Sequence, residues 1–338
     1  MSEQCELKYT DFKSDLSVRW CPGCGDHAIL NSVQKAMANL NVEQHNVAVI
    51  SGIGCSSRFP YYMNTYGFHT IHGRAAAVAS GVKVANPHLH VWEITGDGDA
   101  LAIGGNHFIH LIRRNIDINV ILFNNQIYGL TKGQYSPTSK RGFISKTSPF
   151  GTVEDPFRPG ELALGARSQF FARTVDKELK LSVEVLEEAA KHKGTSIVEV
   201  LQNCVIYNDK THEAITDKEH KLDRTIVLKH GEKMIFGTNR DKGLVMDGMN
   251  IKAVTLGEDG YTMDDILVHD AETHHVSMHR KLANMDYPEL PVALGVIRSA
   301  DGLSYDECVE KQLDEVQKNT RVHTFEELVN SGEVWEVE

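Results

Sequence analysis

The sequence lacks any apolar run long enough to cross a bilayer, and no internal repeat or low-complexity tract is visible. The first absence argues against a membrane-spanning protein, and the second argues against a repeat array. There is also no apolar signal segment, so we expect a reducing cytoplasm in which the cysteines do not form a disulfide framework.

Positive charge is scarce as well. The 35 lysines and arginines stand against 46 acidic residues, which gives a net charge of −11. An acidic surface repels phosphates, so this balance argues against a nucleic-acid-binding protein. The hydrophobic fraction of 41% is ordinary, and 338 residues are enough for one large or two modest globular domains.

The most informative segment of the chain has the pattern of a βαβ unit. Two β-rich apolar runs, Leu89–Thr95 and Ile118–Asn124, flank a helix-like run over 102–115, which predicts parallel strands. Asp97 follows the first strand and Asn125 follows the second. In a right-handed unit both positions fall at the carboxyl edge of the sheet, so we expect the two side chains to converge.

These two side chains are suited to magnesium, which accepts carboxylate and amide oxygens and keeps water or phosphate oxygens as its other ligands. Gly96 and Gly98 let the backbone approach a phosphate, and the next helix directs N–H groups at that anion. The GDG turn and the Asn-Asn loop are each ordinary alone, but their spacing across one unit indicates a diphosphate–magnesium site. The combination resembles thiamine-diphosphate enzymes, which implies that Asp97, Asn125 and the carbonyl of Ile127 hold Mg²⁺.

Four of the six cysteines fall where an α/β sheet would bring them together. Cys21 and Cys24 form a C-x-x-C loop, and Cys55 and Cys204 each follow a predicted strand. If both strands belong to the same parallel sheet, the four thiols gather beside the diphosphate site. Four thiolates can hold zinc or a [4Fe–4S] cluster, and the spacing alone decides for neither.

A specific family resemblance is carried by an ordered set of motifs. The strings WCPGCG, SGIGCSS, HTIHGRA, GDGDA and NNQIYGLTKGQYSPTS, with the late Cys204, resemble the β subunit of the 2-oxoacid:ferredoxin oxidoreductases. The resemblance is strong from about Arg19 to Asn208, and HGEKMIFG and LPVALGVIR resemble the weaker carboxy-terminal segment of that subunit. It implies a [4Fe–4S] cluster on Cys21, Cys24, Cys55 and Cys204. It also implies that Cys55 and the GDG residues contact thiamine diphosphate. The further residues that the resemblance places around this cofactor are Gly54, His72, Gly73, Asp99, Ala100, Tyr128, Gly129 and Leu130.

The resemblance also implies an activity and a partner. The activity is oxidative decarboxylation of a 2-oxoacid, with the acyl group leaving on coenzyme A and the electrons passing to ferredoxin. With a low-potential donor the reaction could run backwards and fix CO₂ onto succinyl-CoA. The family takes the glutamate that activates thiamine from a separate α subunit, and no residue of this chain is a defensible candidate for it. We therefore expect a chain that is inactive alone and that forms an αβ unit, paired again into an (αβ)₂ assembly.

Two cations indicate the substrate. Arg58 follows Cys55 in CSSRF, and Lys132 lies in YGLTKGQ, just past the cofactor loop. An arginine fork and a lysine point charge suit the distal carboxylate of 2-oxoglutarate. The competing interpretation is that both are solvated or pair with acidic neighbours. The GLTKGQ string resembles the members that act on 2-oxoglutarate, although arginine replaces the lysine that such members carry at position 58.

Three other interpretations stay open. An oxidoreductase for pyruvate or a branched 2-oxoacid shares the cofactors but has no distal carboxylate to bind. A non-redox thiamine decarboxylase shares the GDG and Asn-Asn motifs but has no use for four positioned cysteines. A zinc-stabilised binding protein with a decayed cofactor site uses the cysteines and not the diphosphate motif.

The overall pattern predicts an α/β fold, in which a parallel sheet flanked by helices forms a thiamine-diphosphate-binding fold with a smaller carboxy-terminal extension. We predict a cofactor and cluster domain over 1–208 and the extension over 209–338. Segment 134–159 is rich in Ser, Thr, Gly and Pro, and its length is typical of a functional lid or a partner contact. Helices are predicted over 26–39, 73–86, 102–115, 161–172 and 183–193, and strands over 46–51, 89–95, 118–124 and 196–201.

Overall fold

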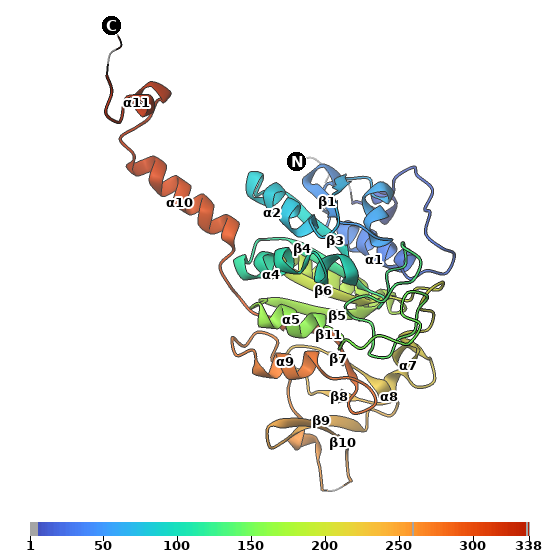
Figure 1. Cartoon of the computed structure of the whole chain (residues 1–338). Helices are drawn as coiled ribbons and strands as arrows, with labels where there is room; N and C mark the ends of the chain where they lie inside the picture. Colours follow the sequence, from blue (N-terminus) through green and yellow to red (C-terminus); the bar gives the residue numbers. More distant parts are fainter. Residues whose placement is uncertain (1–5, 259, 336, 338) are drawn as a thin grey trace.

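The computed structural model describes residues 6–258, 260–335 and 337, and its centre is an eight-stranded sheet (Figure 1). The strands lie in the order β2-β1-β3-β4-β6-β5-β11-β7. Every neighbouring pair is parallel except β11 with β5. The strands are β1 (Val47–Ser51), β2 (Tyr66–His69), β3 (His90–Gly96), β4 (Asn119–Asn124), β5 (Phe170–Val175), β6 (Ser196–Leu201), β7 (Thr225–Leu228) and β11 (Val292–Ser299).

Helices cover both faces of this sheet, which explains why its central strands are buried along nearly their whole length. On one face α1 (Asp26–Asn39) packs against α6 (Leu179–Lys191), and their apolar residues share a hydrophobic cluster with β1, β3 and β6. The other face is covered by α2 (Ala75–Ala85), α4 (Gly105–Arg114) and α5 (Pro159–Gly165). The predicted α/β fold with a mainly parallel sheet is confirmed.

The predicted strands β1, β3, β4 and β6 are neighbours and run parallel, so their carboxyl ends meet at one edge of the sheet. The segments that follow these four strands carry Cys55, Asp97, Asn125 and Cys204. This edge therefore collects the side chains that the sequence singled out.

The helix predicted over 102–115 is confirmed as α4, which begins at Gly105 and ends at Arg114. A short helix that was not predicted, α3 (Asp97–Leu101), begins at the GDG turn. A Cβ on Gly104 would lie 2.3 Å from the carbonyl oxygen of Asp99, and a Cβ on Gly73 would lie 2.5 Å from the Gly104 nitrogen. The two helices are separate because the chain turns here to let two backbones approach closely.

The prediction of a helix over 161–172 was correct at its start and wrong at its end. α5 ends at Gly165, and Phe170–Val175 forms β5 between β6 and β11. Every side chain of β5 is buried. A strand buried on both faces has no alternation of apolar and polar residues, and periodicity cannot distinguish it from a buried helix. The edge strand β2, which pairs with β1, was not predicted either.

The chain after Asn208 adds β7 and β11 to the main sheet and also forms a three-stranded antiparallel sheet, β10-β9-β8. The division near Asn208 stays a prediction. In Figure 1, α10 and α11 extend away from the body of the protein. The elements not yet named are β8 (Ile235–Phe236), β9 (Lys242–Asp247), β10 (Asn250–Thr255), α7 (Glu213–Thr216), α8 (Lys221–Arg224), α9 (Ser277–Ala283), α10 (Tyr305–Asn319), α11 (Phe325–Val329), and the 3₁₀ helices Tyr9–Phe12, Gln44–Asn46, Ser56–Tyr62 and Met263–Asp265.

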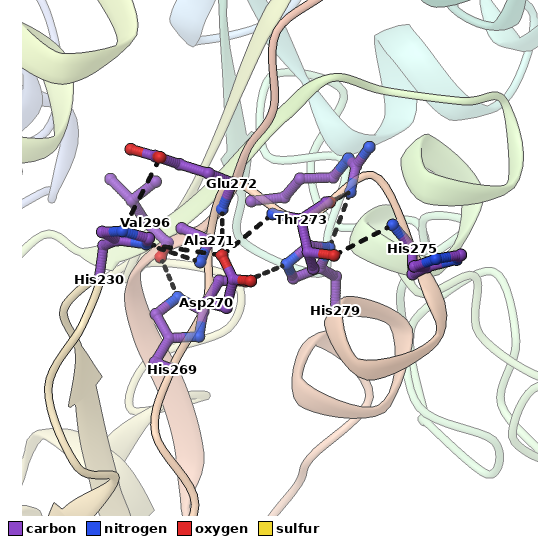
Figure 2. Close-up of polar contacts among 10 residues, drawn as sticks. His230, His269, Asp270, Ala271, Glu272, Thr273, His275, His279 and Val296 are labelled. Atoms are coloured by element: carbon purple, nitrogen blue, oxygen red, sulfur yellow. Dashed lines mark hydrogen bonds and ion pairs between the residues drawn. The ribbon is translucent and has the colours of Figure 1, made fainter.

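A buried histidine network ties the 269–279 segment to β11 (Figure 2). His269 Nε2 lies 2.9 Å from the carbonyl oxygen of Val296, and His279 Nε2 lies 2.7 Å from that of Asp270. Arg298 Nη1 donates to His279 Nδ1 over 2.9 Å. Because arginine can only donate, His279 Nδ1 is the acceptor and the proton is on Nε2. Burial lowers the pKa of both histidines, which agrees with neutral rings.

Among the described residues, no helix is both long enough and apolar enough to span a membrane.

Candidate functional site

Asp97 lies where β3 passes into α3, at the carboxyl edge of the sheet. The adjoining Gly98 packs against Tyr128, since a Cβ on Gly98 would lie 2.2 Å from the tyrosine ring. The Tyr128 hydroxyl also donates to the Gly98 carbonyl over 3.0 Å. Only glycine permits this approach, and the contact holds the GDG turn against the loop that follows β4.

Two hydroxyl groups hold the Asp97 carboxylate. Ser136 Oγ and Thr138 Oγ1 each donate to Asp97 Oδ2 over 2.5 Å. Burial raises the pKa of Asp97 to about 6, and these two hydrogen bonds oppose the rise because they favour the charged form. Both donors bind Oδ2, so neither occupies Oδ1. Sequence reasoning gave these hydroxyls no role, although they lie in the quoted string YSPTS.

Asn125 begins the loop that faces Asp97. Its Oδ1 accepts a hydrogen bond from the backbone N–H of Ile127 over 3.1 Å, and Gln126 between them has a left-handed φ of 56°. Asn208 Nδ2 donates to the carbonyl of Asn125 over 2.9 Å and fixes the turn. Asp97, Asn125 and Ile127 all line one cavity. The structure therefore brings together the three residues expected around Mg²⁺.

Asp99 connects three segments around this cavity. Its Oδ1 accepts from the backbone N–H groups of Gly73, over 2.8 Å, and Ile53, over 3.1 Å. Its Oδ2 accepts from the Thr95 hydroxyl over 2.9 Å. His72 Nε2 lies 3.6 Å from the same carboxylate. Asp99 thus positions the turns after β1 and before α2, and a direct contact between Asp99 and the cofactor stays a prediction.

A cavity that is partly open to solvent lies between these loops. Two expected cofactor residues do not line it, since the Gly73 N–H binds Asp99 and Ala100 is buried in the core. The expected residues that do line it are Gly54, Cys55, His72, Gly96, Asp97, Gly98, Asp99, Asn125, Ile127, Tyr128, Gly129 and Leu130.

The expected cluster cysteines lie beside this cavity. A Cβ on Gly129 would lie 3.5 Å from the sulfurs of both Cys55 and Cys204, so these two thiols face the same turn of the loop that follows β4. Burial raises the pKa of Cys24 and of Cys55, and a nearby carboxylate and the neighbouring cysteines raise them further. Cys21 is exposed, and the other three are partly buried.

Asp26 is a site residue that sequence reasoning missed. It is 1% exposed, it lines the cavity, and its Oδ2 has no hydrogen-bond partner among the described residues. Burial raises its pKa to about 7, and a hydrogen bond with Cys24 opposes that rise. The sequence signal was its position after the CPGCG loop, which indicates a helix start rather than a buried acid.

Arg58 lines a second cleft that adjoins the cavity, whereas Lys132 lines neither hollow and is exposed on the loop at a φ of 78°. Arg19 and His69 share the cleft with Arg58, and no acidic side chain is found among the described residues of its wall. The sequence analysis had assigned no role to Arg19 or His69. The residues common to the two hollows are Ile53, Gly54 and Leu130.

Comparison with known proteins agrees with this geometry. Residues 52–200 match the family model of the thiamine pyrophosphate enzyme C-terminal TPP binding domain. The 2-oxoglutarate oxidoreductase subunit KorB of Mycobacterium tuberculosis is 43% identical over 334 residues, covering 98% of this chain and 89% of that protein. The chain belongs to the 2-oxoacid:ferredoxin oxidoreductase β-subunit family. Another member of this family, the 2-oxoglutarate synthase subunit KorB of Methanothermobacter thermautotrophicus, is 43% identical over 62% of this chain and 76% of its own.

The fold of the family is represented by a solved structure of similar extent. The 2-oxoglutarate:ferredoxin oxidoreductase from Magnetococcus marinus, with 2-oxoglutarate, coenzyme A and succinyl-CoA bound, is 30% identical and superposes with a TM-score of 0.78. The match covers 98% of each chain. The overall fold is therefore shared over nearly the whole length, and the predicted thiamine-diphosphate-binding fold is confirmed over residues 52–200.

Proposed function

We propose that this chain is the β subunit of an enzyme that converts 2-oxoglutarate and coenzyme A to succinyl-CoA and CO₂ and passes the electrons to ferredoxin. One observation carries the proposal. The loop after β4 contributes Asn125 and Ile127 to the cavity wall and, at Gly129, faces the sulfurs of Cys55 and Cys204. A carbon–carbon cleavage site and an electron acceptor held by one loop are suited to oxidative decarboxylation.

The cavity residues fit Mg²⁺ and thiamine diphosphate. Asp97 and Asn125 offer side-chain oxygens and Ile127 offers its carbonyl, which is the ligand type that Mg²⁺ prefers. His72, which also lines the cavity, can donate to a diphosphate oxygen. Gly54 has a φ of 125° and nothing within 4 Å of its missing Cβ, so the backbone there is open to a ligand. Thiamine diphosphate, when bound, supplies the electron sink for loss of CO₂.

The spacing of the cysteines favours a cluster over zinc. Tetrahedral zinc at a Zn–S distance of about 2.3 Å draws its four sulfurs to within about 3.8 Å of one another. No three of the four sulfurs lie within 4.8 Å of one another in the described chain. A [4Fe–4S] cluster binds each thiolate to a different iron, so it requires wider separation. We propose that Cys21, Cys24, Cys55 and Cys204 hold this cluster, whose chemistry is one-electron transfer.

The reaction also needs a second subunit. The acidic residues that line the cavity are Asp26, Asp97 and Asp99, and no glutamate lines it among the described residues. We propose that the α subunit provides the activating glutamate at the subunit interface, within an (αβ)₂ assembly. Cys21 is the exposed member of the cysteine set, so ferredoxin is expected to approach from its side.

The function is tested by purifying the chain anaerobically with its α subunit and measuring viologen reduction with 2-oxoglutarate. Reduction is expected to require both 2-oxoglutarate and coenzyme A, and the isolated β subunit is expected to be inactive. Reduction without coenzyme A would contradict the proposed acyl acceptor. A colourless, zinc-bearing complex without acid-labile sulfide would overturn the redox assignment and favour the non-redox or scaffold interpretations.

The two cations near the site give a sharper test of the substrate. Replacing Arg58 with methionine is expected to raise the KM for 2-oxoglutarate about 10- to 100-fold, since a hydrogen bond between charged groups contributes about 1.5–3 kcal/mol. Pyruvate has no distal carboxylate, so its KM should be unchanged. Lys132→Met should show the same selectivity with a smaller effect, because Lys132 lies outside the cleft wall. Lys146 is exposed, and the Lys146→Met variant serves as the control.

An equal effect of Arg58→Met on both 2-oxoacids would show a general structural role for the arginine. Unchanged kinetics with both would assign the substrate preference to other groups and favour the alternative, an enzyme for pyruvate or a branched 2-oxoacid. The Lys146→Met complex should match the wild type with either substrate.

A further inference from the structure

The segment 134–159 meets the cofactor site through three neighbouring hydroxyl groups. Ser136 and Thr138 donate to Asp97 Oδ2, and Ser139 Oγ donates to the carbonyl of Gln126 over 2.6 Å. The three side chains are only 2–3% exposed. We call these three residues the hydroxyl clamp. It contacts the GDG turn and the Asn125–Ile127 turn together, so it holds both halves of the proposed magnesium site from one segment.

The rest of the segment is held far less firmly. Ile144, Phe150 and Val153 are 68%, 98% and 78% exposed. Arg141 pairs with Asp155 inside the segment itself, and both side chains are exposed. Few buried contacts outside the clamp are therefore available to seat this stretch on the domain.

The clamp also reaches the interior of the sheet. Thr138 Oγ1 lies 3.0 Å from Asn124 Oδ1, and Asn124 Nδ2 donates to Glu199 Oε1 over 2.7 Å. A threonine hydroxyl has a single proton, so Thr138 donates to Asp97 or to Asn124 but not to both at once. The charged carboxylate is the closer and stronger acceptor. The shorter distance therefore directs this hydroxyl to Asp97 and not to Asn124.

We propose that Ser136 and Thr138 are positioning residues for the magnesium ligand Asp97, and that they make cofactor binding and seating of the 134–159 segment mutually dependent. The proposal rests on the function proposed above. Two donors on Oδ2 would fix the plane of the carboxylate and leave Oδ1 for the ion, as partners outside the coordination sphere commonly do. Coupling between two equilibria is reciprocal. Bound Mg²⁺–thiamine diphosphate therefore stabilises the seated segment by the same free energy by which the seated segment favours cofactor binding.

Magnesium titrations of the cofactor-depleted αβ complex, with thiamine diphosphate in excess and binding followed by calorimetry, test the first half. Thr138→Val keeps the shape and removes the hydroxyl, and the half-saturating Mg²⁺ concentration is expected to rise about 10- to 100-fold. Thr138→Ser should restore it to within a few-fold of the wild type. Ser136→Ala should shift it in the same direction as Thr138→Val, and serves if the valine variant does not fold. Thr147→Val, in an exposed part of the same segment, should change nothing.

Trypsin cleavage after Lys140, Arg141 and Lys146, which are all exposed, tests the second half. Mg²⁺ with thiamine diphosphate is expected to slow cleavage of the wild-type complex, and Thr138→Val should need correspondingly more Mg²⁺ for the same protection. Equal half-saturation in folded Thr138→Val and wild type, or no rescue by serine, would overturn the positioning role. Cleavage that ignores the cofactor would overturn the coupling. A wild-type complex that binds no thiamine diphosphate would overturn the proposed function as well.

Discussion

Replacing Cys204 with alanine is expected to remove the [4Fe–4S] cluster and to lower 2-oxoglutarate-dependent viologen reduction by more than about 100-fold, since the proposed electron route then loses its carrier. The Cys204 sulfur faces Gly129, on the loop that follows β4, together with the sulfur of Cys55, which lines the cavity. Iron and acid-labile sulfide should fall together with activity. Both are measured on the anaerobically purified αβ complex.

The matched control is Cys308→Ala. Cys308 is an exposed free cysteine on α10, and its removal should leave iron, sulfide and activity unchanged. Thiamine diphosphate binding should survive in Cys204→Ala, because the side chains that line the cavity do not include Cys204. A variant that keeps full iron and activity would show that Cys204 is not a ligand.

Breaking the Arg173–Glu199 pair is expected to have the largest effect on stability. The Arg173 Nε donates to Glu199 Oε2 over 2.7 Å, and the two side chains are only 7% and 2% exposed. Arg173→Met leaves the Glu199 charge buried without its partner, which should cost about 3–5 kcal/mol of unfolding free energy. The loss includes the hydrogen bond from Arg173 Nη2 to the carbonyl of Ala283, which fastens the end of α9 to β5.

This prediction is checked by chemical denaturation of the αβ complex at pH 7, followed by circular dichroism. Replacing both partners, as Arg173→Met with Glu199→Leu, should recover part of the loss because no unpaired charge remains. The exposed Arg141–Asp155 pair serves as the control, and Arg141→Met should leave the transition midpoint unchanged. A double variant less stable than Arg173→Met would show that the hydrogen bond from Asn124 to Glu199 matters more than the ion pair.

Local sequence patterns were sufficient to predict the central parallel strands and the residues that follow them. The strands β3 and β4 flank a helical run, and their parallel pairing placed Asp97 and Asn125 at the same edge. Cys55 and Cys204 followed because each comes directly after a predicted strand of the same sheet. These placements need only the handedness of the crossover and the period of the apolar residues.

Local patterns failed where burial hid the signal or where two distant backbones meet. Phe170–Val175 forms a strand buried on both faces, so it carries no alternation to reveal it. The helix α4 begins three residues later than predicted because Gly104 approaches Gly73, a contact that the helical period of 102–115 does not encode. The Asp26 carboxyl oxygen that has no partner in the described part of the chain, and the cation-lined cleft around Arg58, are likewise products of packing between elements.

The sequence by itself determined that this is an α/β protein with a diphosphate–magnesium signature, four gathered cysteines and a β-subunit pattern. Short motifs carry those features, and the lengths of the strands and helices set the spacing of the motifs. The tertiary structure alone decided which groups support them. Ser136 and Thr138 lie 39 and 41 residues from Asp97 along the chain, yet both bind its carboxylate. Contacts at such separations depend on how the loops pack over the sheet edge, and no local period predicts that.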